Sequence, residues 1–395
     1  MSTTVTAMTG ILGWGLQYST LGGASIKCGD KAGVSTNWDK YKPGGTDNLL
    51  EAWYRHKAMQ VDFGIVDDTR VSDPETGGTP YPTGAYKASE FVAGGGVIQP
   101  RLEDAFALLL YALTGYASVL GAQDVEDNAV ADVATHQFRF RTDTPLNSVS
   151  LPWLAVRKYI PAAAANEDME EIGQDCRLTA MRIAIPQSGV MVATPAFMGR
   201  KGTMADQSFA AWEDYDGFDS IAISTKGHFK LAAEDTAAPF ANGTEYPALG
   251  VTLDFTNGLT TPAQEMIIGD YHPDDFAALQ RALIIRWTYK WQDDVLYRAI
   301  KANAGTGASI DWSPLVYRAA FELLLESADV IGATEQSYQF YVHAPSVHWQ
   351  SDGSPRLVGG GMLAVDMIGT ALLPASGDYA EIRMCHDDVA YQWES

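Results

Sequence analysis

Four pairs of adjacent acidic residues are the first candidates for chemistry: Asp67-Asp68, Asp274-Asp275, Asp293-Asp294 and Asp387-Asp388. Together with the ten tryptophans they raise the idea of a carbohydrate-active β-sandwich. Glycosidases hold two carboxylates about 5 to 9.5 Å apart across a cleft and place sugars on aromatic rings. Neighbouring residues of a strand point to opposite faces, and Asp293-Asp294 precedes a helical pattern that it can cap. The acid pairs therefore predict no catalytic dyad.

Other catalytic and cofactor signatures are also missing from the sequence. There is no phosphate-binding P-loop, no dinucleotide-binding glycine pattern, no zinc-protease histidine pair and no nucleophile elbow. The spacing of the seven histidines suggests no helical pair of metal ligands. We therefore expect no catalytic residues, no metal and no cofactor, and we expect that the protein is not an enzyme.

The charge balance narrows the class of partners. Lys and Arg number 27 against 49 Asp and Glu, which gives a net charge of −22. This sign disfavours a protein that wraps nucleic-acid phosphates or binds an anionic membrane. The N-terminus has neither a basic start nor a long apolar stretch, and the three cysteines lie far apart. We expect a cytoplasmic site of synthesis, free thiols and no membrane binding by this chain.

The elements that must position any site are mostly strands. Thr179–Ile185 and Val190–Ala193 flank a Pro-Gln-Ser-Gly turn, and Val251–Phe255 alternates up to Asn257-Gly258, a hairpin-turn signal. Alternation also predicts a half-buried strand over Ile284–Trp291. Tyr317–Ser327 suits a strand or a helix, and we favour a strand. The sequence therefore predicts a mainly β fold, an antiparallel sandwich or barrel with short flanking helices.

Two helices are predicted, and their spacing hints at an internal repeat. Leu102–Gly115 has acids at its start, a strong helix-forming run and a terminal glycine, so we expect a buried helix of about three turns. A second acid-started helix is expected over Gln292–Gly305. The same offset pairs Asp104 with Asp294 and Gly115 with Gly305. The alternative is that any strand followed by an acid-capped helix looks similar, so duplication stays open.

Aromatic residues are the candidates for a subunit interface. The chain has 10 Trp, 18 Tyr and 14 Phe, and many of them lie in the turn-rich N-terminal part. Trp and Tyr are favoured anchors of protein interfaces, although burial in the chain's own core would explain them equally well. The candidate interface residues are Trp38, Tyr41, Trp53, Tyr54, Tyr81, Tyr86, Trp287 and Tyr289.

The order of these features resembles the tail tube (major tail) proteins of long-tailed bacteriophages. The resemblance runs from about residue 80 to the C-terminus and rests on order and texture rather than on an invariant motif. It is carried by Tyr81–Tyr86, Val97–Asp104 before the helix that ends at Gly115, Leu151–Val156, Val251–Gly258, Ile284–Tyr297 and Val358–Met367. The Trp-rich N-terminal segment and the acidic stretch Trp212–Glu245 depart from the family pattern.

The resemblance implies a fold of tail-tube type and assembly with copies of the same chain into stacked rings. The rings would be hexameric, or pseudo-hexameric trimers if the chain is duplicated, and would form the hollow tail of a virion. Double-stranded DNA would pass through the lumen without specific binding, and other tail proteins would meet the tube ends. The segment from about Lys40 to Gly95 is the candidate for contacts between stacked rings, the alternative being a long loop packed on its own subunit. The implied divisions are an N-terminal strand and arm segment (1–84), a β domain (85–205), an acidic linker or insertion (206–245) and a second β domain (246–395).

Two other functions remain open from the sequence. One is another virion protein, either a tail-terminal ring or a capsid decoration protein, which would share the β-rich texture without open-ended polymerisation. The other is the carbohydrate-active β-sandwich, which would need two convergent carboxylates in a cleft.

Overall fold

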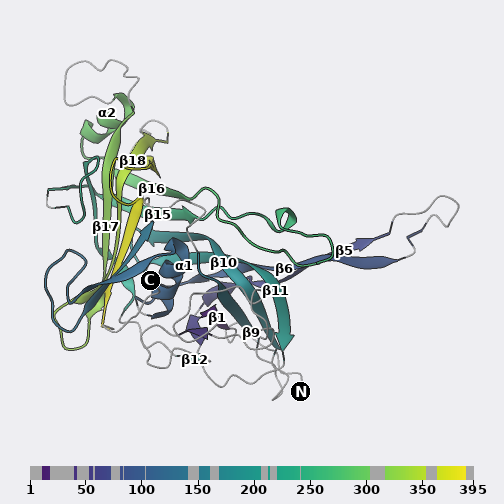
Figure 1. The fold of residues 1–395 in the computed structure, drawn as a ribbon. Helices are drawn as coiled ribbons and strands as arrows, with labels where there is room; N and C mark the ends of the chain where they lie inside the picture. The colour runs from purple at the N-terminus through teal and green to yellow at the C-terminus, as the bar shows by residue number, and fades with distance from the viewer. Residues whose placement is uncertain are drawn as a thin grey trace, which may run out of the picture.

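A computed structural model describes residues 11–17, 40–41, 53–56, 58–72, 81–82, 84–102, 104–140, 151–160, 169–205, 212–213, 220–240, 242–302, 316–352 and 363–387. The fold is mainly β, as predicted, and its strands pair antiparallel with one described exception, the parallel pair β12–β3. Most strands belong to one large, curved sheet, from which β5 and β6 project as a long arm (Figure 1).

The strands are β1 Ile11–Gln17, β2 Lys40–Tyr41, β3 Trp53–His56, β4 Ala58–Val61, β5 Gly64–Val71, β6 Ala85–Ile98, β7 Ala117–Gly121, β8 Ala134–Phe140, β9 Leu154–Ile160, β10 Met169–Pro186, β11 Val192–Ala205, β12 Trp212–Glu213, β13 Ala222–Ala233, β14 Thr244–Glu245, β15 Ala248–Thr256, β16 Ala282–Lys290, β17 Arg318–Val330, β18 Ser337–Ser351, β19 Ala364–Ala371 and β20 Ala380–His386. In the described part of the chain the helices are α1 Asp104–Thr114 and α2 Val295–Ala302, and a 3-10 turn spans Pro262–Gln264.

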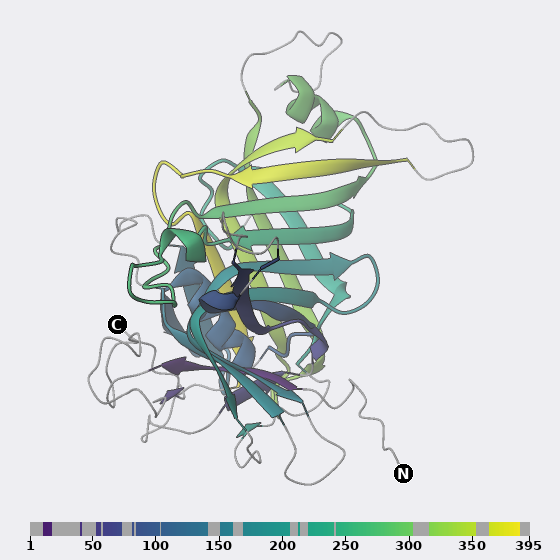
Figure 2. The ribbon, with the colours of Figure 1, turned by 90° about the vertical axis from the view of Figure 1, so that its right-hand side faces the viewer.

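The strand pairs define two groups that meet at one joint. In the first group the neighbours run β1–β9–β10–β11–β6–β5. In the second group they run β13–β17–β18–β19–β16–β15. The pairing of β10 with β15 joins the two groups into one sheet. Figure 2 views the molecule from the side of the arm, with the strands of this sheet stacked one above another.

Side-chain alternation explains why these segments form half-buried strands. In β16 the side chains of Leu283, Ile285, Trp287 and Tyr289 are buried, whereas Arg286 and Lys290 are exposed. The hairpin β10–β11, the helix α1 and the strands β15 and β16 agree with the sequence prediction. β17 is also a strand, as favoured, and it is buried from Ala319 to Leu325. Burial of both faces explains why its sequence lacks clean alternation.

The prediction of a tight hairpin turn at Asn257-Gly258 is wrong. β15 and β16 do pair, but the connection between them, which we call the 257–281 loop, is much longer. The backbone N–H of Asn257 donates to the carbonyl oxygen of Thr179 (2.8 Å), and its Nδ2 donates to that of Leu178 (2.8 Å). Asn257 is therefore tied to β10 of the other group, which a local turn motif cannot reveal.

Each group folds into two packed layers. In the first group, the Trp14 ring of β1 lies 6.1 Å from the Phe197 ring of β11. In the second group, the Phe229 ring of β13 lies 4.2 Å from the Trp287 ring of β16 and also packs on Phe321. These aromatic contacts fill the space between the layers and supply much of the apolar area that is removed from water.

Helix α1 lies between the two groups and is buried, as its sequence predicts. Every side chain from Phe106 to Leu113 is buried. The Phe106 ring contacts Phe340 of β18 at 5.9 Å, and nearby Phe140 of β8 stacks on Phe255 of β15 at 5.6 Å. The pairs β7–β8, β8–β20 and β20–β18 extend the sheet beside the helix. A helix without a polar face is stable only in such an enclosed place.

The acidic range 206–245, expected as a linker or insertion, includes β13. This strand is paired along β17 and contributes Phe229 to the core of the second group. Part of this acidic range is therefore a strand of the second group's core.

Candidate functional site

One face of the sheet that spans both groups presents polar side chains to solvent, and we call it the outer face. Cross-strand partners share a face, so the register defines its rows. One row is Val192, Ala184, Thr252, Arg286 and Ile368, and the next is Thr194, Arg182, Asp254, Ile284 and Thr370. Small and polar residues dominate both rows, in contrast to the apolar face beneath.

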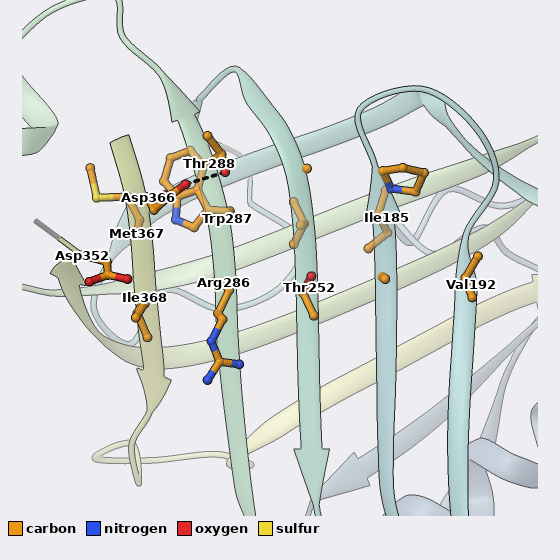
Figure 3. A pocket seen from close by; sticks show the side chains of 14 residues that line it. Ile185, Val192, Thr252, Arg286, Trp287, Thr288, Asp352, Asp366, Met367 and Ile368 are labelled. Atoms are coloured by element: carbon orange, nitrogen blue, oxygen red, sulfur yellow. Dashed lines mark hydrogen bonds between the residues drawn. The ribbon is translucent and has the colours of Figure 1, made fainter. Parts of the chain in front are cut away.

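A hollow of about 690 Å³ lies on this outer face. Figure 3 shows the side chains that line it, which come from neighbouring strands on both sides of the β10–β15 joint. The Thr288 hydroxyl donates to the Asp366 carboxylate at 2.7 Å, and Asp352 lies at the same end of the hollow. The hollow therefore extends across β11, β10, β15, β16 and β19.

Two arginines of the outer face share one carboxylate. The Nε of Arg182 lies 3.5 Å from Oδ1 of Asp254, and an Nη of Arg286 donates to Oδ2 of the same residue. The three residues come from β10, β15 and β16, so the cluster crosses the joint between the groups. We call these three residues the Arg–Asp–Arg cluster.

The 257–281 loop is anchored to β6, β10 and β11 by further polar contacts. The Nε of Arg200 donates to the carbonyl oxygen of Pro273 (2.7 Å), and its Nη2 lies 3.3 Å from Asp270. The backbone N–H of Glu90 donates to the carbonyl oxygen of Tyr271 (2.9 Å). A hydrogen bond from the backbone of His272 holds the pKa of Asp270 below its usual value.

Arg177 fixes the other side of the same loop. Its guanidinium lies 3.8 Å above the Trp153 ring, and its Nη1 lies 3.5 Å from Oδ1 of Asp275. Burial lowers the pKa of Arg177, and the nearby Asp275 carboxylate acts in the opposite direction. The loop is therefore attached by two arginines of the first group.

The arm formed by β5 and β6 presents aromatic side chains to solvent. Tyr81 is 72% exposed and Tyr86 is 58% exposed. Asp67 and Glu90 face each other directly across the arm, an unfavourable pair of like charges. Lys87 bridges them, with its Nζ 2.7 Å from Asp67, and the hydrogen bonds with Asp67 and Glu90 raise the pKa of Lys87.

The predicted interface residues separate into three sets. Tyr81 and Tyr86 are exposed on the arm, as an interface role requires. Trp287 and Tyr289 are only 3% and 1% exposed, so their assignment to an interface does not fit: on β16 they point into the core toward Phe229 and Tyr246. Trp38 lies outside the described residues, and for Tyr41, Trp53 and Tyr54 only the backbone in β2 and β3 is described.

The acid pairs of the sequence do not converge. Asp67 pairs with Lys87, whereas Asp68 on the opposite face pairs with Arg70 at 2.9 Å. Asp293 accepts a hydrogen bond from the first residue of α2, Val295 (3.1 Å), and Asp294 pairs with Arg298 one turn on. Asp274 and Asp275 lie in the 257–281 loop, and Asp388 is outside the described residues. Among the described residues, no group of three or more His, Cys, Asp or Glu could hold a metal ion.

Sequence reasoning missed the Arg–Asp–Arg cluster. The available signal was alternation: Asp254 separates the core residues Leu253 and Phe255, and Arg286 separates Ile285 and Trp287. Alternation places each residue on a polar face but does not identify its neighbours on other strands.

Comparison with known proteins adds no assignment. No protein-family model matches the sequence, and no curated protein matches it significantly. Within the described part of the chain, no helix is both long enough and apolar enough to cross a bilayer.

Proposed function

We propose that this protein is a structural subunit of a bacteriophage tail tube, which assembles into stacked rings around a channel for the viral genome. It acts without enzymatic activity or a cofactor, as part of a virion assembled in the host cytoplasm. The observation that carries the proposal is the matching topology of the two strand groups, since a subunit with two equivalent halves suits a ring.

The two groups match in chain order, spatial order and helix position. We number the six strands of each group in chain order. Across the sheet, the strands of both groups then follow the order first, fourth, fifth, sixth, third and second. In each, the helix follows the third strand, β6 or β16. In this matching β15 corresponds to β5, and β18 to β10. Such agreement supports an internal duplication, and three duplicated chains would build a pseudo-sixfold ring.

The β10–β15 joint indicates how a ring could close. Within the chain, β15 adds to the edge of β10 and continues the sheet from one group to the other. Its counterpart β5 pairs with β6 alone among the described strands. An open strand edge is a liability in a monomer, and pairing with the next copy would remove it. Repetition of the joint between copies would close the sheet into a barrel.

The outer face suits the wall of a channel. It bears the hollow, and it carries threonines together with two arginines that share Asp254, while Asp352 and Asp366 line the hollow beside Arg286. Duplex DNA carries one negative charge per about 1.7 Å of its axis, so a wall of unpaired cations would hold it. A wall with compensated charges would let DNA pass without specific binding.

The arm is the proposed contact between rings. It projects from the body of the subunit (Figure 1) and exposes Tyr81 and Tyr86. Exposed aromatic side chains on a projecting element are suited to protein contacts. At the ends of the tube the same surfaces would meet other tail proteins.

Negative-stain electron microscopy of the purified protein over a concentration series tests the proposal. We expect hollow tubes, with threefold symmetry in averaged end views because the two halves are similar but not identical. Closed single rings that never stack would favour a tail-terminal ring protein instead. A protein that stays monomeric at every concentration, and also when supplied with tube ends as nuclei, would contradict assembly.

A further inference from the structure

We propose that Asp254 masks Arg182 and Arg286, and that without this carboxylate the outer face would bind the phosphates of double-stranded DNA. The inference rests on the proposed function in one respect, namely that this face meets DNA. The masking itself is a property of the isolated chain and can be tested without tubes.

The geometry gives Asp254 this role because each of its carboxylate oxygens serves one arginine. Oδ1 lies 3.5 Å from Nε of Arg182, and Oδ2 accepts from Nη1 of Arg286. The arginine side chains remain 59% and 46% exposed, whereas that of Asp254 is 24% exposed. The two cations are therefore accessible from solvent, and their shared counter-charge lies closer to the sheet between them.

Stability does not explain the cluster well. Ion pairs between exposed side chains contribute about 0 to 1 kcal/mol, because water and salt screen them. The backbone pairing of β10, β15 and β16 already fixes the three strands. Guanidinium groups are, however, strong and geometrically specific ligands for phosphate. Two exposed guanidinium groups on one face of the sheet, of which Arg286 also lines the hollow, would form a phosphate-binding site unless a carboxylate occupies them.

The outer face offers a matched control for the charge change. Asp366 lies on β19, its carboxylate accepts from the Thr288 hydroxyl at 2.7 Å, and no arginine of the Arg–Asp–Arg cluster pairs with it. Asp254→Asn and Asp366→Asn both raise the net charge by one unit on the same face. A general electrostatic effect would change both variants equally, whereas unmasking would change only Asp254→Asn.

The experiment measures binding of a linear double-stranded DNA fragment to the full-length protein as salt is varied. The wild type and Asp366→Asn should show little retention, and Asp254→Asn should bind. Two newly available cations would make the slope of log K against log salt steeper by about 1.8, so a fourfold reduction in salt should strengthen binding by about tenfold. Adding Arg182→Gln and Arg286→Gln to Asp254→Asn should abolish this binding.

Equal DNA binding by Asp254→Asn and Asp366→Asn would overturn the inference, as would wild-type binding as tight as that of Asp254→Asn. Asp254→Thr is a second variant that guards against misfolding, since Thr252 and Thr256 already occupy the same face of β15. If the wild type forms no tubes even when supplied with tube ends as nuclei, the proposed function fails on its own, because the DNA-binding result does not depend on assembly.

Discussion

The guanidinium of Arg281 donates a hydrogen bond to the backbone carbonyl oxygen of Thr114 (3.0 Å), the last residue of α1. A second bond from the same nitrogen reaches the carbonyl oxygen of Leu113, and Nε donates to Oδ1 of Asn257 at 3.0 Å. The last carbonyls of a helix have no partner within it, and a cation there also suits the helix dipole. Arg281, which precedes β16, thus ties the second strand group to the helix of the first.

Replacing Arg281 should weaken this connection. Arg281→Met keeps an apolar stem over the Phe140 ring but leaves the carbonyls of Leu113 and Thr114 without their donor. Burial lowers the pKa of Arg281 to about 10, because the charged guanidinium loses contact with water. Part of the free energy gained from these hydrogen bonds therefore only offsets this desolvation. We expect the free energy of unfolding to fall by about 1.5 to 3 kcal/mol in urea titrations. Arg286→Met is the control and should change the free energy of unfolding by less than about 1 kcal/mol. An equal loss in both variants would show that Arg281 does not stabilise the protein through the end of α1.

The buried carboxylate of Glu322 makes a second stability prediction. It accepts hydrogen bonds from the backbone N–H of Phe240 (2.7 Å) and the hydroxyl of Tyr341 (3.0 Å), and Lys230 lies 3.2 Å away. Burial, together with the negative charge of Glu322, raises the pKa of Tyr341, which keeps its hydroxyl a donor. Tyr341→Phe should therefore lower the free energy of unfolding by about 1 to 3 kcal/mol. Tyr86→Phe, at an exposed residue, is the control and should leave the free energy of unfolding almost unchanged. If Tyr341→Phe also left it unchanged, the Tyr341 hydroxyl would not be needed for stability.

His343 should make stability depend on mildly acidic pH. Burial lowers the pKa of His343 below its ordinary 6.5, although Glu381 acts in the opposite direction. Below about pH 6.5 the unfolded chain binds a proton that the folded chain excludes, so stability falls as pH decreases toward the folded-state pKa. His343→Gln should flatten this part of the curve of unfolding temperature against pH.

The control for the His343 experiment is His228→Gln, because His228 is an exposed histidine beside Glu245. Its curve should keep the acid-side slope of the wild type. An unchanged slope in His343→Gln would mean that other groups carry the pH dependence.

The arm makes a prediction about assembly. Tyr81→Ser with Tyr86→Ser should leave the unfolding temperature unchanged, because both side chains are largely exposed. If the arm joins rings, the double variant should form shorter tubes or single rings in electron microscopy. Leu373→Ser, at another exposed apolar residue, is the matched control. Deleting residues 72–80, which connect β5 to β6 in the sequence, should likewise leave a folded monomer that polymerises poorly. Tubes of normal length from both variants would exclude the arm from the contact.

Local sequence determined several of the strands and both helices. The alternation in β16, the hairpin β10–β11 and the apolar run of α1 follow from side-chain periods of single elements, and these predictions are confirmed. The start of the second helix was also visible in the sequence. Asp294, which the offset pairs with Asp104, directly precedes the first residue of α2, and Asp104 is the first residue of α1. These features depend on neighbours along the chain, so the sequence contains the information needed to find them.

Only the tertiary structure decided which faces are buried and which strands are neighbours. The sequence could not tell that Trp287 and Tyr289 point into the core, or that Asn257 bonds to β10 instead of closing a tight turn. Nor could it bring Arg182, Asp254 and Arg286 together, because they come from three strands whose register is set by pairing between distant segments. Alternation specifies two faces of a strand, but burial and strand pairing are non-local and emerge only when the whole sheet packs.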